Sequence, residues 1–150
     1  MLEFPGFSAT QVPMSIFDQR LIADGSIAEL AKREYTVFVR SVFLQGLFFL
    51  DPDEVTDPIL LEHAVPGIRR LRQIAAQLGL TVAQLAIAFM RDCGGVTSLV
   101  LGADNAAQVA DSVASFETPA LEPGMVDVLK KEFAQVDIPA IMQVLSRPKG

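Results

Sequence analysis

The chain has 150 residues, and its 18 acidic and 12 basic side chains give a formal net charge of −6. Its length predicts a single domain over residues 1–150, and its 51% hydrophobic residues exclude a disordered chain, which needs low hydrophobicity. The acidic balance argues against a nucleic-acid partner, because nucleic-acid-binding domains neutralise phosphates with clustered Lys and Arg. The single cysteine, Cys93, excludes an internal disulfide and a cysteine-based metal site, and the single histidine, His63, leaves little for metal ligation by imidazole.

No segment of the chain has the pattern of a targeting signal or a membrane anchor. The N-terminus lacks a basic region followed by an apolar run and a small-residue cleavage site. The most apolar stretch, Val42–Leu50, is far shorter than the roughly 20 residues that span a bilayer. We therefore expect a cytoplasmic protein with no membrane partner.

Strand-like and helix-like segments alternate in the first part of the chain. Ala9–Met14 is a short extended candidate, and Pro13 marks its end because proline lacks a ladder donor. Ser26–Glu29 has the spacing of a capping box, which predicts a helix beginning there. Thr36–Ser41 is continuously β-branched and aromatic, which favours a strand covered on both faces. Residues 42–58 have loop-like composition, with two Asp-Pro pairs.

Two helices are predicted next. Pro66 suits a first helical position, and apolar residues then recur at helical spacing until Gly79. Thr81–Gln84 is a second capping box, and it begins an apolar helix that reaches about Asp92. We expect the apolar residues of that helix to form core, and they include Leu85, Ile87, Phe89 and Met90.

The last part of the chain completes an alternating pattern. Ser98–Leu101 is a third strand candidate, and Asn105–Gln108 begins a helix with a third capping box. An amphipathic helix follows near Pro123, Asp137 precedes one further helical turn, and Arg147–Gly150 is expected to be frayed. Strands that alternate with helices of this length indicate βαβ units and a parallel sheet.

Ligands of parallel α/β folds bind beyond the carboxyl ends of the strands. The third strand candidate ends at Gly102, and a capped helix begins three residues later. Free N–H groups at a helix start bind anions, and glycine lets a phosphate approach the backbone. The alternative is an ordinary strand-to-helix turn with no ligand.

Several segments, in order, resemble the C-terminal half of the aldo-keto reductases. The resemblance covers about Ala9 to Phe133, and it rests on the ordered set rather than on one motif. The matching segments are Thr10–Ser15 with Asp18–Arg20, Val37–Gly46, Gly79–Ala86, and Val96–Gly102 followed by Gln108.

The resemblance implies an α/β fold, namely a partial (β/α)8 TIM barrel made of the last three β/α units. A complete barrel usually needs about 250 residues, so the first five strands are missing. The catalytic Asp, Tyr, Lys and His of the family lie on those strands, so no catalytic residue is assigned here. Tyr35 is expected to pack and His63 to lie on the surface. Without a tyrosine to donate the proton, the chain alone is predicted to be inactive.

The resemblance also implies contacts with NADP or NAD. Gln11 matches the family's glutamine at the nicotinamide carboxamide, and Arg40 falls where an aromatic ring often stacks on the nicotinamide, as a guanidinium also can. Ser41, Phe43 and Gly46 match the family's loop that lies along the pyrophosphate of the cofactor; in this chain that loop follows the second strand. The loop and helix start at the adenosine end contribute Gly102, Ala103, Asp104 and Gln108.

Structural roles remain open for these residues. Gln11 could satisfy backbone groups, and Arg40 could form an ion pair with Asp51 or Asp53. Asp104 departs from the family, which usually offers Lys or Arg there to the 2′-phosphate of NADP. A carboxylate repels a phosphate and can accept a hydrogen bond from a ribose hydroxyl. The sequence therefore leaves open whether the cofactor is NADP or NAD.

Three parallel strands leave two open sheet edges, which invite pairing with another chain. We therefore expect a homo-oligomer or a partner that supplies the missing N-terminal half. Two functions remain: the cofactor-binding half of a carbonyl reductase, or a non-catalytic nucleotide-binding or oligomeric assembly module derived from one.

Overall fold

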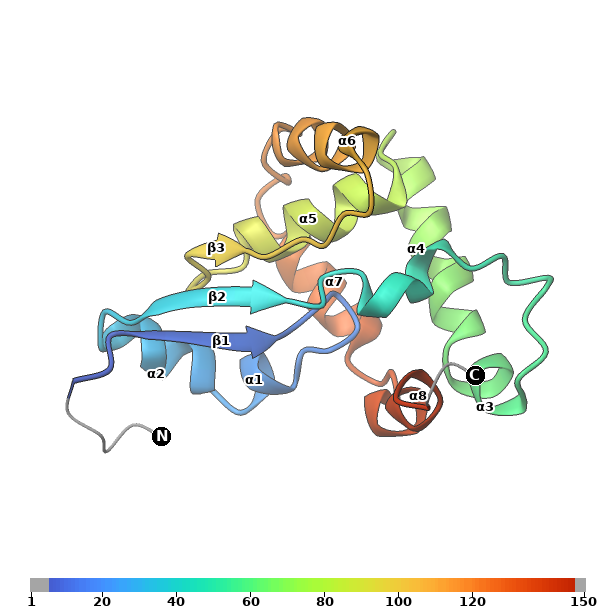
Figure 1. The fold of residues 1–150 in the computed structure, drawn as a ribbon, viewed down its shortest axis with the longest axis horizontal. Helices are drawn as coiled ribbons and strands as arrows, with labels where there is room; N and C mark the ends of the chain where they lie inside the picture. The colour runs from blue at the N-terminus through green and yellow to red at the C-terminus, as the bar shows by residue number, and fades with distance from the viewer. Residues whose placement is uncertain (1–5, 148–150) are drawn as a thin grey trace.

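The computed structural model describes residues 6–147, which form a three-stranded parallel sheet with flanking helices (Figure 1). The elements in chain order are β1 (Ala9–Pro13), α1 (Arg20–Ala23), α2 (Ser26–Lys32), β2 (Thr36–Arg40), the 3₁₀ segment η1 (Leu44–Phe49), α3 (Pro58–His63), α4 (Val65–Gln77), α5 (Val82–Asp92), β3 (Ser98–Leu99), α6 (Ala106–Phe116), α7 (Met125–Phe133) and α8 (Ile138–Leu145).

The sheet has the order β1-β2-β3, and β2 pairs in parallel with both neighbours. In the register of the sheet, Phe38 lies between Gln11 and Ser98. The third strand is shorter than the predicted Ser98–Leu101. The Val100 amide still donates to the Val39 carbonyl at 2.8 Å, and the chain then leaves the sheet. The carboxyl ends of β2 and β3 therefore lie beside each other, as the βαβ pattern predicts.

Only one face of the sheet is covered. Val37 and Val39 are fully buried, whereas the alternate residues Thr36 and Phe38 are partly exposed and Arg40 is exposed. Figure 1 is viewed onto the less buried face, which carries Thr36, Phe38 and Arg40, with α2 and α5 behind the strands. The prediction that Thr36–Ser41 is covered on both faces is wrong for this chain, because the sheet has no second layer within residues 6–147. The uncovered side is called the bare face below.

The core lies between the sheet and α4, α5 and α7. The predicted core residues of α5 are fully buried. Phe17, from the turn after β1, lies in the middle of an aromatic cluster. Its ring centroid is 4.7 Å from that of Phe48 in η1 and 5.1 Å from that of Phe133 in α7. The second contact joins residues 116 positions apart, and together the two contacts hold the loop after β2 against α7.

Of the predicted capping boxes, Thr81–Gln84 is confirmed in full: the Thr81 hydroxyl accepts from the Gln84 amide and the Gln84 side chain accepts from the Thr81 amide. The box at Ser26 is wrong. The N-cap is Gly25 with a left-handed φ of 78°, and Ser26 is the first helical residue, its amide bonded to the Asp24 carboxylate at 2.8 Å. Asp24 competes for the role that Ser26 was expected to fill.

Parts of the predicted loop at residues 42–58 are helical. Asp57 caps α3 by accepting from the amides of Ile59 (2.9 Å) and Leu60 (3.2 Å), with Pro58 at the start of the helix. The tail after Asp137 forms the whole of α8 rather than one turn. Arg147, expected to be frayed, bonds to the Asp57 carboxylate at 2.8 Å, and residues 148–150 lie outside the described range.

No single helix in the described part of the chain is long and apolar enough to cross a membrane. Within the described residues, only α4 and α5 taken together have the length and composition of a membrane-spanning segment, and their axes are bent by 88° relative to each other.

Candidate functional site

A pocket of about 730 Å³ opens at the carboxyl ends of β2 and β3. Its walls come from the loop after β2, the loop after β3, the first turns of α5, and one side of α6. This is the edge at which parallel α/β folds bind ligands. Its volume lies within the range of roughly 300–1,000 Å³ that is typical of small-molecule sites.

Most of the residues singled out from the sequence converge on this pocket. The predicted residues that line it are Ser41, Phe43, Gly46, Gly102, Ala103, Asp104 and Gln108. Gln11 and Arg40 do not line it. Gln11 is exposed on β1, and Arg40 is exposed at the end of β2, where its guanidinium donates to the Ser41 hydroxyl at 3.2 Å. Asp53 does not pair with Arg40, because it accepts from Arg69 at 2.6 Å.

Apart from Gln108, sequence reasoning missed the wall that α6 contributes to the pocket. The side of α6 that faces it carries Gln108, Asp111, Ser112 and Ser115 at helical spacing. The only sequence signal for this wall was the polar stripe itself, and a polar stripe on an amphipathic helix ordinarily faces solvent. Gln45, Phe49, Ala83 and Ile87 also line the pocket and carried no such signal.

The loop after β2 has an unusual backbone. Ser41, Leu44 and Gln45 have φ values of 63°, 46° and 56°, and Gly46 continues the run at 88°. Non-glycine residues in the left-handed region cost about 1–3 kcal/mol each and persist only when their surroundings over-determine them. Buried side chains supply that constraint, since Leu44, Leu47 and Phe48 are at most 3% exposed.

The loop after β3 is folded back onto the start of α6 by two hydrogen bonds. The Asn105 side chain accepts from the Gln108 amide at 3.0 Å, which confirms Asn105 as the N-cap. The Gln108 side-chain oxygen accepts from the Asp104 amide at 2.6 Å, one residue earlier than in the predicted capping box. Both bonds fix the backbone between Gly102 and the helix, where the pocket is lined.

The pocket carries negative side chains and a positive backbone. Its charged lining residues are Asp104 and Asp111, and within residues 6–147 no Lys or Arg lines it. The N-terminus of α6, with the positive end of its helix dipole, lies beside the same space, because Asp104 before the helix and Gln108 in its first turn both line the pocket. The arrangement suits an anion placed at the start of α6 beside a neutral, hydroxyl-bearing group.

The sequence model of the aldo/keto reductase family matches residues 2–131. The chain belongs to the aldo/keto reductase family. A search of curated protein sequences returned no significant match. The family match and the fold together confirm the resemblance noted in the sequence, and they confirm a partial barrel.

Solved aldo-keto reductase structures share the fold of this chain. The glycerol dehydrogenase AKR11B4 from Gluconobacter oxydans matches with a TM-score of 0.65 at 20% identity, over 95% of this chain and 44% of that one. The holo form of AKR11C1 from Bacillus halodurans matches with a TM-score of 0.65 at 18% identity, over 87% and 44%. The thermostable reductase Tm1743, solved with the inhibitor epalrestat, matches with a TM-score of 0.59 at 18% identity, over 82% and 39%. The chain therefore spans less than half the length of these structures.

The remaining candidate side chains lie outside the pocket. Tyr35 precedes β2 and is partly buried against the core, as predicted. His63 lies at the surface, as expected: its side chain is 30% exposed, and it lies 3.9 Å from the exposed carboxylates of Glu62 and Asp137. Among residues 6–147, no group of three His, Cys, Asp or Glu side chains is placed to hold a metal ion.

Proposed function

We propose that this aldo-keto reductase chain binds the adenosine and pyrophosphate part of NAD(H) in the pocket at the ends of β2 and β3. The observation that carries the proposal is the convergence of seven residues, from two loops and α6, on one pocket of suitable size. The holo form of AKR11C1 and the NAD(P) dependence of the family support it.

The shape of the pocket fits such a ligand. A Cβ added at Gly46 or at Gly102 would meet nothing within 4 Å, so the backbone of each loop borders open space that a ligand can occupy. The positive end of α6 would attract the pyrophosphate, as helix N-termini commonly do. The Asp104 carboxylate would accept from a ribose hydroxyl. Gln11 and Arg40, on the bare face, would lie toward the nicotinamide.

We further propose a preference for NAD over NADP. The 2′-phosphate of NADP adds about two negative charges, and the pocket offers it Asp104 and Asp111 and no described cation. The preference should be strongest at low ionic strength, because salt screens repulsion between exposed charges.

The chain alone is proposed not to reduce carbonyls. A bound reduced nicotinamide supplies the hydride, but the carbonyl oxygen also needs a proton from a general acid. Within the described residues, no Tyr, Lys or His lines the pocket. The activity of the longer relatives therefore requires groups that this chain does not place there.

The test is a titration of the purified chain with NADH and NADPH, followed by nicotinamide fluorescence. We expect saturable binding of NADH and weaker binding of NADPH. Asp104→Arg should reverse the preference, whereas Asp127→Arg, the same charge change on exposed Asp127 of α7, should not. Absence of NADH binding at millimolar concentration by a well-folded chain would overturn the proposal.

The bare face supports a second candidate, an assembly module. Apolar side chains flank both sheet edges, since Phe7 before β1 is 68% exposed and Val100 after β3 is 44% exposed. A standard interface buries about 800 Å² per partner, and uncovered sheet edges with apolar flanks are sites at which another chain commonly adds.

We propose a second copy of the chain as the partner that covers this face. Light scattering on the purified chain should give the mass of a dimer or a larger oligomer. A monodisperse monomer at micromolar concentration would overturn the homo-oligomer and favour a separate polypeptide that carries the earlier strands.

A further inference from the structure

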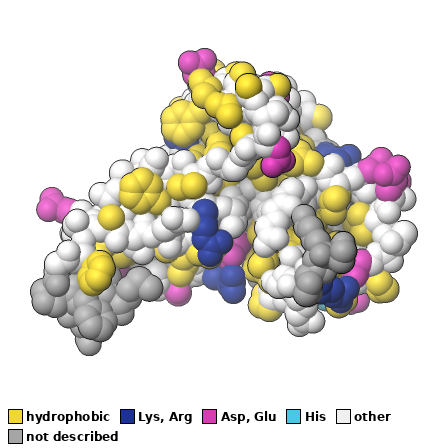
Figure 2. Space-filling view, viewed as in Figure 1, with side chains coloured by type: hydrophobic (Ala, Val, Ile, Leu, Met, Phe, Trp, Pro, Cys, Tyr) yellow, Lys and Arg dark blue, Asp and Glu magenta, His cyan; other side chains and the backbone are white. Residues whose placement is uncertain are grey.

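Helix α6 forms one wall of the pocket but is poorly held by burial. Ser115 is its only buried residue, and Val109, Val113 and Phe116 on another side are 53%, 57% and 46% exposed. Figure 2 shows hydrophobic side chains gathered over this helix. A helix with so little apolar burial gains little from packing, which normally provides most of the stability of helices in proteins. Its position must depend on other contacts.

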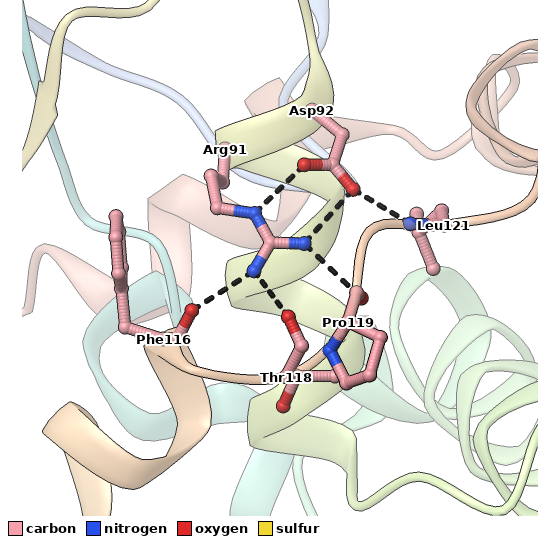
Figure 3. A network of polar contacts seen from close by, with 6 residues as sticks. All are labelled: Arg91, Asp92, Phe116, Thr118, Pro119 and Leu121. Atoms are coloured by element: carbon pink, nitrogen blue, oxygen red, sulfur yellow. Dashed lines mark hydrogen bonds and ion pairs between the residues drawn. The ribbon is translucent and has the colours of Figure 1, made fainter.

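The strongest polar contacts near α6 come from one arginine at the end of α5. The Arg91 guanidinium donates to the carbonyl oxygens of Phe116 (2.9 Å), Thr118 (2.5 Å) and Pro119 (3.2 Å), as Figure 3 shows. The Phe116 carbonyl belongs to the last residue of α6, whose final carbonyls lack helical partners. Arg91 thus caps the C-terminus of α6 from a neighbouring helix, where a positive charge is favourable.

A carboxylate fixes the arginine in this orientation. Asp92 accepts two hydrogen bonds from Arg91, at 2.7 and 3.0 Å, and a third from the Leu121 amide at 2.8 Å. The two side chains are only 20% and 18% exposed. The hydrogen bonds from Arg91 hold the pKa of Asp92 below its ordinary value, and those to Asp92 raise the pKa of Arg91, so both stay charged. The pair ties residues 116–121 to the end of α5.

We propose that the Arg91–Asp92 pair is a positioning element for the nucleotide pocket, because it fixes the C-terminal end of α6 on α5. The inference rests on the proposed function for its ligand. The helix spans about 16 Å, so a tilt of about 10° at one end moves the other by about 3 Å. Ser112 and Ser115, in the half of α6 nearer the pair, line the pocket. Loss of the pair would therefore change the width of the pocket while the sheet and core remain folded.

The experiment compares Arg91→Met, Arg91→Lys and Asp92→Asn with the wild-type chain by two readouts. Hydrogen–deuterium exchange reports the protection of the α6 peptide against that of the α5 peptide, and fluorescence titration reports the Kd for NADH. Arg69→Met is the matched control, because Arg69 forms an exposed ion pair with Asp53 at 2.6 Å. We expect Arg91→Met to speed exchange in α6 about tenfold with α5 unchanged and to raise the Kd about tenfold. Arg91→Lys should give a smaller effect, and Arg69→Met none.

The two readouts separate this inference from the proposed function. If the wild-type chain does not bind NADH, the nucleotide proposal fails, while the exchange of α6 still decides whether the pair positions the helix. Unchanged exchange in α6 for Arg91→Met and Asp92→Asn would overturn the inference. Equal acceleration in α5 and α6, in Arg91→Lys as well as in Arg91→Met, would also overturn it, because it would show a general loss of stability.

Discussion

Gly95 gives the sharpest stability prediction, because it combines a special backbone conformation with a close contact. It lies in the turn between α5 and β3 with φ of +91°. A Cβ at this position would be 2.6 Å from Cγ2 of Ile27 and 3.1 Å from the Ile27 carbonyl oxygen. Ile27 is 2% exposed on α2, so it has little room to move. Gly95→Ala should therefore strain both the turn and the packing of α2.

The magnitude follows from the two effects. Alanine in the left-handed region costs on the order of 1 kcal/mol. Ordinary contacts begin near 3.4 Å, so Ile27 would have to move by almost 1 Å within a packed core, and overpacking of this kind costs about 1–3 kcal/mol. Together they predict a loss of about 2–4 kcal/mol in the free energy of unfolding. For a chain of this size that corresponds to about 5–15 °C in Tm.

The assay is urea unfolding followed by circular dichroism, with Gly94→Ala as the neighbouring control. A Cβ at Gly94 would meet nothing within 4 Å, and its φ lies outside the left-handed region, so the control should be neutral or slightly stabilising. The m value should stay constant in both variants. Equal midpoints for the two variants would refute the packing of the α5–β3 turn against α2 described above.

The other predictions concern a cap, a carboxylate and the cysteine. Thr81→Ala should cost about 1 kcal/mol because it removes the N-cap of α5, whereas Ser26→Ala should change stability by less than about 0.5 kcal/mol; urea unfolding compares them. Acid should destabilise the wild type more than Asp92→Asn, because Arg91 lowers the pKa of Asp92 and the resulting stabilisation is lost as pH falls through that lowered value; unfolding curves from neutral pH to about pH 3 test this. Burial raises the pKa of the Cys93 thiol, so a thiol reagent should label the native chain far more slowly than the unfolded chain.

Local signals were sufficient for the fold where one interaction dominated. Thr81 faces no competitor for the first turn of α5, and its capping box formed as predicted. At Ser26 the neighbouring Asp24 and Gly25 offered the backbone a better arrangement, so the same pattern failed. Asp57 followed by proline was a usable helix signal that the loop-like composition around it concealed. The left-handed run at Leu44 and Gln45 follows from buried neighbours rather than from the preferences of those residues.

The candidate site was predictable as far as strand ends determine it. The two loops meet because β2 and β3 are neighbours in a parallel sheet, so their flanking residues share one pocket. Gln11 and Arg40 lie outside it because they are exposed on the strands themselves and not in those loops. The contacts of Arg91 were beyond sequence reasoning, since its partners are backbone carbonyls about 25–28 residues away, which carry no residue-type signature.

The two-residue length of β3 has a consequence for the order of folding. β1 and β2 pair across 27 positions, but Phe38 and Ser98 pair across 60, and this larger loop costs about 0.7 kcal/mol more to close. Closure of the smaller loop forms a five-residue ladder between β1 and β2, whereas closure of the larger loop forms a ladder of only two residues between β2 and β3. We therefore expect β3 to dock late and to detach early in partial unfolding. The pocket depends on β3 and α6, so nucleotide binding should disappear before the aromatic cluster around Phe17 is exposed.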